Sequence, residues 1–433
     1  MKKSLLKNER LRASYLRVEH PSGLTILLYP MPEFSTAYAL FGTNYGSVDN
    51  CFKTGADKDF VHVPDGIAHF LEHKLFESED GDAFSLFAET GADANAYTSF
   101  DKTCYVFSCT DRFEDSLKAL LTFVQAPYFT QQTVEKEQGI IGQEIRMYDD
   151  SPGWRVMFDL LECLYESSPV KVDIAGTVES IAEINADLLY RCYRTFYNLS
   201  NMVLAVSGNF DPDRALAIIE ENLKPSEPVR IERAPYNEPD GICKKETFRH
   251  MDVSLPYFYM GYKIRPEEDP MEFQRQQYEL EILHDLLAGP SSDLNEELLE
   301  AGLINSSFGD EVLAGRGFLA SMFGGESRDP RKVRDRFLET VEKARREGFS
   351  EEDFLSAKNA MYGRMLRGLN DVENAATAML TAEMAGVGLF DTIDLLASVK
   401  LADVEKRLET FDSERLALSV ILPREGEYAS LYK

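Results

Sequence analysis

The 433-residue sequence lacks a long apolar run and is short of basic residues. No segment approaches about 20 consecutive apolar residues, so no membrane-spanning helix is expected. The basic N-terminus is not followed by the apolar stretch of about 7–15 residues that a signal peptide needs. Lys and Arg number 46 against 74 Asp and Glu, which argues against a nucleic-acid-binding surface. These absences predict a cytoplasmic protein that binds neither membrane nor nucleic acid.

Cysteine is also sparse, and its spacing carries no motif. The six cysteines are scattered without a C-x-x-C pair. In a chain long enough for two or three domains, this pattern favours reduced thiols over a disulfide framework or a cysteine-rich metal site. The net charge of −28 serves general solubility or lines a cavity that favours cationic peptides.

One pentapeptide carries recognisable chemistry, His69-Phe70-Leu71-Glu72-His73. Residues three and four apart share one face of a helix, so His69 and His73 can bind one cation with Glu72 beside them. This H-x-x-E-H order is the reverse of H-E-x-x-H and is known as the inverzincin arrangement. It implies zinc-assisted hydrolysis of peptide bonds. The alternative is a helix whose three polar side chains are merely solvated.

A catalytic zinc ion usually has three protein ligands and an open position for water, so a third ligand must come from another segment. The best candidate is Glu144, in the predicted helix 131–148. Glu137 lies about two helical turns earlier, so both carboxylates project from one face. We assign Glu144 as the third ligand and Glu137 as the carboxylate that orients an imidazole N–H. The alternative is a pair of solvated glutamates on a surface helix.

These assignments give each group a role. Zinc lowers the pKa of a water molecule towards about 7 and stabilises the oxyanion that develops on the scissile carbonyl. Glu72, which is not needed as a ligand, accepts the proton of that water and passes it to the departing amine. The predicted cofactor is one Zn2+ ion per chain. Manganese or cobalt stay open as the metal used in the cell.

The order of predicted elements recurs in the two halves of the chain. Strand-like segments at 25–29 and 37–41 precede the motif, helical stretches follow, and a buried strand at 202–208 closes the first half. The second half runs from a strand at 256–262 through helices to a closing strand at 416–422. This order predicts an α+β fold of two similar domains from an internal repeat.

Only the first copy of the repeat carries the motif. Aligning His73 with His284 places leucines, Leu280 and Leu283, at the other two motif positions. His284 alone is therefore expected to be a structural histidine. The predicted organisation is a zinc-bearing catalytic domain, a polar linker and a degenerate domain without metal, at residues 1–225, 226–241 and 242–433.

With these residues in place, the chain resembles the pitrilysin/insulinase family of zinc metallopeptidases over nearly its whole length. The resemblance rests on the motif, on the Glu137/Glu144 pair, and on segments 91–98, 174–177 and 201–204. In length the chain is similar to half-size bacterial members and to mitochondrial processing peptidase subunits. Around the motif it resembles the bacterial subgroup associated with elongation-factor-P modification. The resemblance implies two domains that are each a mostly antiparallel sheet covered by helices.

The resemblance also implies how substrate and partner bind. The segment from Asn95 to Thr98 matches a sheet edge that receives the peptide substrate as an added strand, through its unpaired N–H and C=O groups, with Asn95, Ala96 and Tyr97 as the substrate-binding residues. The alternative is an ordinary strand with turn-forming residues. Half-size chains of the family join in pairs around their substrate, so we expect a homodimer or a heterodimer with a homologous subunit.

One departure from the family pattern leaves two hypotheses for the function. Active members often carry an Arg and a Tyr in the second domain that help to bind substrate, and Leu299 and Asn305 stand at those positions. The leading hypothesis is a zinc-dependent metalloendopeptidase that hydrolyses short or unfolded peptides. The alternative is a zinc-retaining peptide-binding or assembly subunit that is inactive without a homologous partner.

Overall fold

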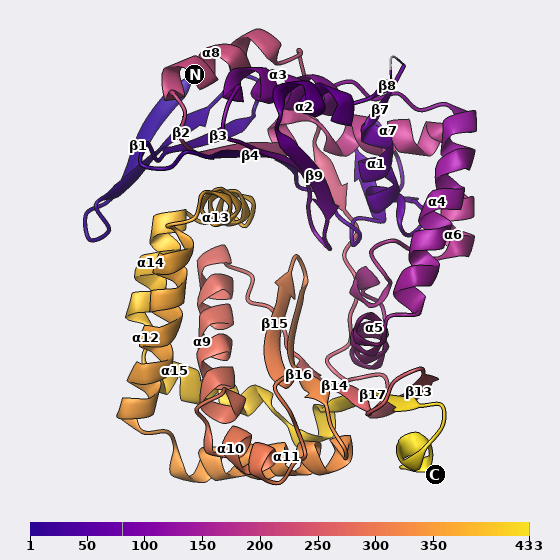
Figure 1. The fold of residues 1–433 in the computed structure, drawn as a ribbon, viewed down its shortest axis with the longest axis vertical. Coiled ribbons are helices and arrows are strands. Elements are labelled where there is room, and N and C mark those ends of the chain that lie inside the picture. The colour runs from indigo at the N-terminus through magenta and orange to yellow at the C-terminus, as the bar shows by residue number, and fades with distance from the viewer. Residues whose placement is uncertain (80, 433) are drawn as a thin grey trace. The chain divides into compact units, whose positions relative to one another are not determined.

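The computed structural model describes residues 1–79 and 81–432, which divide between two compact units (Figure 1). The first unit comprises Met1–Ile145, Asp173–Pro235 and Met365–Thr392. The second comprises Arg146–Val172, Tyr236–Arg364 and Ile393–Lys433. Each unit is built around its own sheet and contains segments from both halves of the chain.

The first unit is built on a seven-stranded sheet with the order β1-β2-β3-β11-β4-β10-β9. In sheet order the strands are β1 (Lys2–Asn8), β2 (Ala13–Glu19), β3 (Thr25–Pro30), β11 (Met202–Gly208), β4 (Ala37–Thr43), β10 (Thr103–Cys109) and β9 (Asp93–Thr98). All pairs are antiparallel except β3 with β11. Strands β11 and β4 are buried along their whole length, as their continuous apolar runs require.

The second unit repeats this topology with five strands in the order β13-β17-β14-β16-β15. They are β13 (Glu246–Met251), β17 (Ala417–Pro423), β14 (Tyr257–Lys263), β16 (Phe318–Glu326) and β15 (Gly309–Gly315). Its one parallel pair, β13 with β17, occupies the place of β3 with β11 in the first sheet. The predicted α+β class and the internal repeat are confirmed.

Helices cover both sheets, and within the described residues none is long and apolar enough to cross a membrane. Those of the first half are α1 (Ile67–Leu75), α2 (Phe84–Thr90), α3 (Phe113–Val124), α4 (Gln131–Asp149), α5 (Pro152–Leu164), α6 (Val178–Ala182), α7 (Ala186–Phe196) and α8 (Pro212–Asn222). Those of the second half are α9 (Pro270–Ala288), α10 (Asp293–Glu300), α11 (Pro330–Glu347), α12 (Glu351–Gly368), α13 (Val372–Met384), α14 (Leu389–Ser398) and α15 (Leu401–Lys406).

The two halves of the chain exchange one helix each. Helix α13, from the second half, packs on β11 and β4 of the first sheet, where Gly42 leaves room for Leu380 and Met384 (Figure 1). Helix α5, from the first half, packs on β14 and β17 of the second sheet, where Val156 joins a core cluster with Ile421. Each helix buries its apolar side chains against the sheet of the other half.

This exchange means that the units do not coincide with continuous domains at 1–225 and 242–433. Segment 146–172 belongs to the second unit and segment 365–392 to the first. The stretch 226–241, expected as a linker, also carries a strand of its own. Strand β12 (Ile231–Arg233) pairs with β5 (Cys51–Thr54), which in turn pairs with β6 (Val61–His62).

Candidate metal centre

The H-x-x-E-H motif lies on helix α1 of the first unit, and the packing of this helix sets the direction of its polar face. Phe70 and Leu71 are fully buried in the core of the first unit. Each contributes about 1.5–3 kcal/mol through burial of its apolar surface. The side chains of His69 and His73 stay 12% and 26% exposed. The apolar contacts of α1 therefore hold both imidazoles at the partly open side of the helix.

The start of α1 is fixed by a close approach of two backbone segments. Gly66 precedes the helix with a φ of 86°, and a Cβ there would lie 2.3 Å from the carbonyl oxygen of Ala175. Gly176 makes the reciprocal approach to Asp65, so both positions require glycine. The Ser180 hydroxyl donates to the Asp65 carbonyl. These contacts give segment 174–177, noted in the sequence, a structural role.

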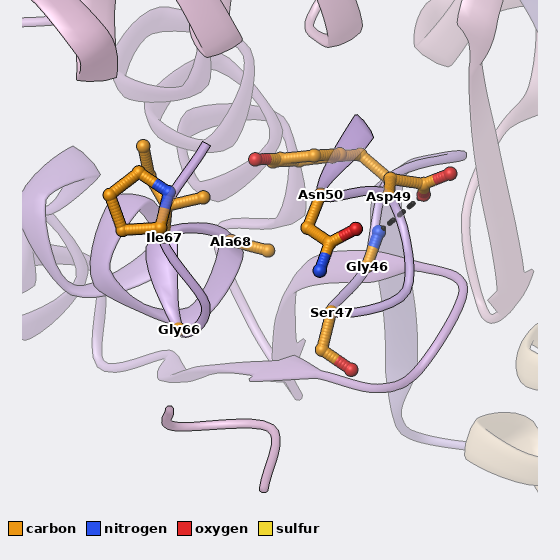
Figure 2. Close-up of a pocket in the computed structure, with 9 residues that line it drawn as sticks. Gly46, Ser47, Asp49, Asn50, Gly66, Ile67 and Ala68 are labelled. Atoms are coloured by element: carbon orange, nitrogen blue, oxygen red, sulfur yellow. Dashed lines mark hydrogen bonds between the residues drawn. The ribbon is translucent and has the colours of Figure 1, made fainter. Parts of the chain in front are cut away.

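A small recess borders the same end of α1. Figure 2 shows Gly66, Ile67 and Ala68 beside the loop that carries Gly46 and Asn50. The Asn50 amide donates to the Asp65 carboxylate at 2.7 Å, which ties this loop to the start of the helix. The lining residues of the recess do not include the predicted metal ligands. The recess is therefore separate from the metal centre.

Helix α4 supplies the two carboxylates expected from the second segment. Val134, Ile141 and Ile145 are buried at helical spacing, and Glu137 is buried with them. The Glu144 side chain, about two turns after Glu137, stays 23% exposed. Both glutamates reach the histidines of α1, which places all four predicted side chains together in the first unit.

The distances define a compact cluster. Glu144 Oε1 lies 3.7 Å from His69 Nε2, and Glu144 Oε2 lies 3.4 Å from His73 Nε2. Within the described residues, His69, His73 and Glu144 are the one group of His, Cys, Asp or Glu whose three ligand atoms all lie within 4.8 Å. Tetrahedral ligands about 2 Å from zinc are about 3.3 Å apart. The cluster therefore needs only small side-chain rotations to fit such an ion.

The donor chemistry agrees with this geometry. Two imidazole nitrogens and one carboxylate are a typical catalytic zinc set, with a fourth position left for water. His73 Nδ1 lies 3.0 Å from Glu137 Oε1, so the imidazole can donate from Nδ1 and keep Nε2 free for a metal. The residues present thus fit zinc, and Glu137 lies where an orienting carboxylate is needed. The ligand assignments themselves stay predictions.

The pKa values of the two histidines are shifted in opposite directions. Burial and the nearby His73 lower the pKa of His69 to about 3, so this imidazole is neutral at neutral pH. Burial also acts to lower the pKa of His73, but the hydrogen bond with Glu137 and the charges of Glu72 and Glu144 raise it above its ordinary value. His73 is therefore the histidine at which protons compete with a metal.

Glu72 lies beside the cluster without belonging to it. Its side chain is buried, and this burial raises its pKa, while a hydrogen bond from Thr98 opposes the rise. The Thr98 hydroxyl donates to Glu72 Oε2 at 2.6 Å. A buried carboxylate held at one oxygen suits a general base. The role of Thr98 was not foreseen from the sequence, because the contact depends on how α1 packs on β9.

Asn95, Ala96 and Tyr97 lie on β9, which ends the order of the first sheet. The Ser99 N–H donates to the Lys102 carbonyl at 2.8 Å, so this pair is hydrogen-bonded across the β9–β10 hairpin. Along β9, residues that bond to β10 then alternate with residues whose N–H and C=O groups point away from it. By this alternation the N–H and C=O groups of Ala96 face the open edge of the sheet. The side chain of Asn95 accepts from the Ala96 N–H at 2.8 Å. The predicted substrate segment therefore lies at a sheet edge that can receive another strand.

The equivalent helix of the second unit, α9, has lost this chemistry. Leu280 and Leu283 are fully buried, as core-facing leucines would be. His284 is also fully buried, and its two ring nitrogens are paired with Asp310 and Ser321 at 3.0 and 2.9 Å. Both nitrogens are thus occupied by protein partners. This is the structural histidine predicted from the repeat.

The comparisons with known proteins agree with this fold. Residues 51–178 match the family model described as insulinase (peptidase family M16), and residues 183–361 match the model described as the peptidase M16 inactive domain. An uncharacterized zinc protease of Bacillus subtilis, YmfH, is 39% identical over 97% of this chain and 99% of its own length. The chain belongs to the insulinase, or M16, family of peptidases.

Solved structures give the same result. The crystal structure of an M16-like protein from Alicyclobacillus acidocaldarius matches with a TM-score of 0.91 and 35% identity, over 96% of this chain and 99% of that one. A protease from Helicobacter pylori matches with a TM-score of 0.81 over 95% and 100% of the two chains. Its identity is 19%, so this second likeness shows the fold alone.

Proposed function

We propose that the chain is a zinc-dependent metalloendopeptidase that hydrolyses short or unfolded peptides. The observation that carries the proposal is the position of Glu72. A site that only stored or sensed a metal would need His69, His73 and Glu144, whose ligand atoms cluster within 4.8 Å. It would have no use for a further buried carboxylate beside the cluster, held by Thr98 at 2.6 Å. The zinc-protease names of the relatives support the same metal.

Each residue of the site has a distinct role in the proposed reaction. His69, His73 and Glu144 would hold the zinc ion, and Glu137 would fix the His73 ring through Nδ1. When bound, zinc would supply Lewis acidity, lowering the pKa of a water molecule towards about 7 and stabilising negative charge on the carbonyl oxygen. Glu72 takes the proton from the attacking water and gives it to the departing amine.

The substrate would bind as an added strand along β9. The open-edge N–H and C=O groups of Ala96 would pair with the peptide backbone, which gives affinity with little dependence on sequence. The Asn95 amide, which accepts from the Ala96 N–H in the free protein, would turn to the peptide instead. This mode favours extended segments, so short or unfolded peptides are the expected substrate class.

A second candidate function is a zinc-retaining subunit that binds peptides or assembles with a homologous partner. Two observations favour it. The model that matches residues 183–361 is described as an inactive domain. The second is that Leu299 and Asn305 lack the cationic and phenolic groups expected at their positions. Leu299 is exposed on α10, and the Asn305 side chain donates to Glu326. In either function we propose a homodimer or a heterodimer with a homologous subunit.

One experiment separates the two functions. The protein is purified from its native cells together with whatever associates with it, and the eluate is screened against a broad peptide library with and without a chelator. Chelator-sensitive cleavage supports the peptidase. No cleavage by the zinc-loaded eluate, together with full cellular function in a Glu72→Gln strain, would instead support the binding or assembly subunit.

A further inference from the structure

Thr98 occupies the end of β9, and its main chain and side chain face different parts of the site. The hairpin alternation that directs Ala96 to the open edge directs the N–H and C=O groups of Thr98 there as well. Its side-chain hydroxyl donates to Glu72 Oε2 at 2.6 Å. One residue thus joins the edge expected to pair with a peptide to the carboxylate expected to act as base.

The direction of the Thr98 hydroxyl is set by a second threonine. Thr103 lies directly opposite Thr98 on β10, and the two hydroxyl oxygens are 3.3 Å apart. The Thr103 hydroxyl donates to the Tyr45 carbonyl at 2.9 Å. Each hydroxyl has a single proton. With the Thr103 proton on Tyr45, the Thr98 proton is left for Glu72.

Burial makes this hydrogen bond important for the orientation of Glu72. Glu72 is 8% exposed, so water offers it few partners. Hydrogen bonds to ionised groups are stronger than those between neutral groups, and a buried carboxylate that loses one can turn to another rotamer. A rotation of this kind would move the carboxylate relative to a peptide paired along β9.

We propose that Thr98 is a positioning residue that holds the Glu72 carboxylate in register with a peptide strand bound along β9. The proposal rests on the proposed peptidase function and adds to it the residue that couples substrate binding to the base. The backbone of Thr98 contacts the substrate and its hydroxyl fixes the carboxylate, so the two are held at a constant separation.

The test compares Thr98→Val, which removes the hydroxyl and keeps the shape, with Thr98→Ser, which keeps the hydroxyl. Kinetics use a quenched fluorescent peptide that the wild-type protein cleaves. We expect Thr98→Val to lower kcat about 10- to 100-fold with KM changed by less than about threefold, as for loss of a hydrogen bond to a charged group. Thr98→Ser should keep most of kcat, and zinc content should be equal in all three proteins.

Thr195→Val is the matched control, because it removes another buried threonine hydroxyl, one bonded to the Arg191 carbonyl on α7. We expect this variant to cleave at the wild-type rate. Wild-type kcat in Thr98→Val would overturn the proposal. A loss in Thr98→Ser or Thr195→Val as large as that in Thr98→Val would also overturn it.

Crystal structures of the zinc-loaded wild type and Thr98→Val decide the proposal even if no peptide is cleaved, which separates its failure from failure of the peptidase function. The expected result is a Glu72 carboxylate displaced to another rotamer in Thr98→Val, with His69 and His73 in place. An unmoved carboxylate would overturn the proposal.

Discussion

At the scale of single residues, the three carboxylates and two imidazoles of the site take different roles because their neighbours differ. His69 is neutral because it is buried, and His73 is drawn towards protonation by Glu137. Glu144 lies within 3.7 Å of both imidazoles, whereas Glu72 accepts a hydrogen bond from Thr98. Burial and hydrogen bonding, more than residue type, assign the roles of ligand, orienting group and base.

The orienting role of Glu137 predicts a specific loss. Glu137→Gln removes the carboxylate that faces His73 Nδ1 at 3.0 Å, so the ring is held less firmly and its Nε2 becomes a weaker ligand. Zinc affinity should fall about 10- to 100-fold, measured by competition with a chelating dye. Glu135→Gln, at an exposed position of the same helix, is the control and should bind zinc as the wild type does. Equal affinities in both variants would contradict the assignment.

The two histidines predict the pH dependence of zinc binding. His73 has a pKa above its ordinary value of about 6.5, so it is mostly protonated at pH 6.5 and below, and zinc must displace that proton. His69, with a pKa of about 3, stays neutral over the same range. Zinc affinity should therefore fall by about one log unit per pH unit below about pH 6.5. Calorimetry at several pH values would contradict this with a slope near zero or near two.

At the scale of elements, the five strands predicted from the sequence correspond to β3, β4, β11, β14 and β17, but their partners were not predicted. The closing strand at 202–208 and the helix at 131–148 correspond to β11 and α4 almost residue for residue, because the first is a continuous apolar run and the second has apolar residues at helical spacing. Periodicity shows that a helix has a buried face but not which sheet covers it. For this reason the exchange of α5 and α13 was not foreseen.

In the candidate site, too, local spacing predicts some residues and tertiary packing decides the others. His69, Glu72 and His73 share a local helical spacing, and Glu144 follows from the need for a third ligand, so all could be named from the sequence. The contact of Thr98 with Glu72 depends on the register of β9 with β10 and on the packing of α1, which involve segments far apart in the chain. A spacing rule cannot find such a contact.

The surroundings of Gly66, before α1, and of Gly139, in α4, predict opposite effects on stability when each is replaced by alanine. Gly66→Ala forces a side chain into a φ of 86° and towards the Ala175 carbonyl, so it should lower the free energy of unfolding by about 1–3 kcal/mol. Gly139→Ala lies in α4 with open space around its Cβ and should raise it by about 0.5–1 kcal/mol. Urea denaturation measures both. A neutral Gly66→Ala would show that α1 does not depend on this close approach.

At the scale of the whole molecule, the two halves of the repeat share a fold but differ in the residues at the motif positions. The five strands of the second sheet follow the order of five strands in the first, but among the described residues only the first half brings three possible metal ligands together. In the second, Leu280 and Leu283 fill the core and His284 is bonded on both nitrogens. The second half thus keeps the fold of the first without its metal chemistry.

The exchange of helices predicts that neither half of the chain is stable alone. A fragment of residues 1–235 lacks α13, which packs on β11 and β4, and would expose this apolar face. We expect the fragment to bind a hydrophobic dye and to unfold at lower urea than the full chain. Coexpression with residues 236–433 should restore a stable complex. A fragment as stable as the full chain would contradict the packing seen here.

We propose that His69, His73 and Glu144 bind a catalytic zinc ion and that Glu72 is the base. The most direct measurement compares zinc content and peptide cleavage in the wild type and in Glu72→Gln. We predict about one zinc ion per chain in both, with cleavage lowered at least about 100-fold in the variant and abolished in both by a chelator. Wild-type cleavage by zinc-loaded Glu72→Gln would contradict the claim.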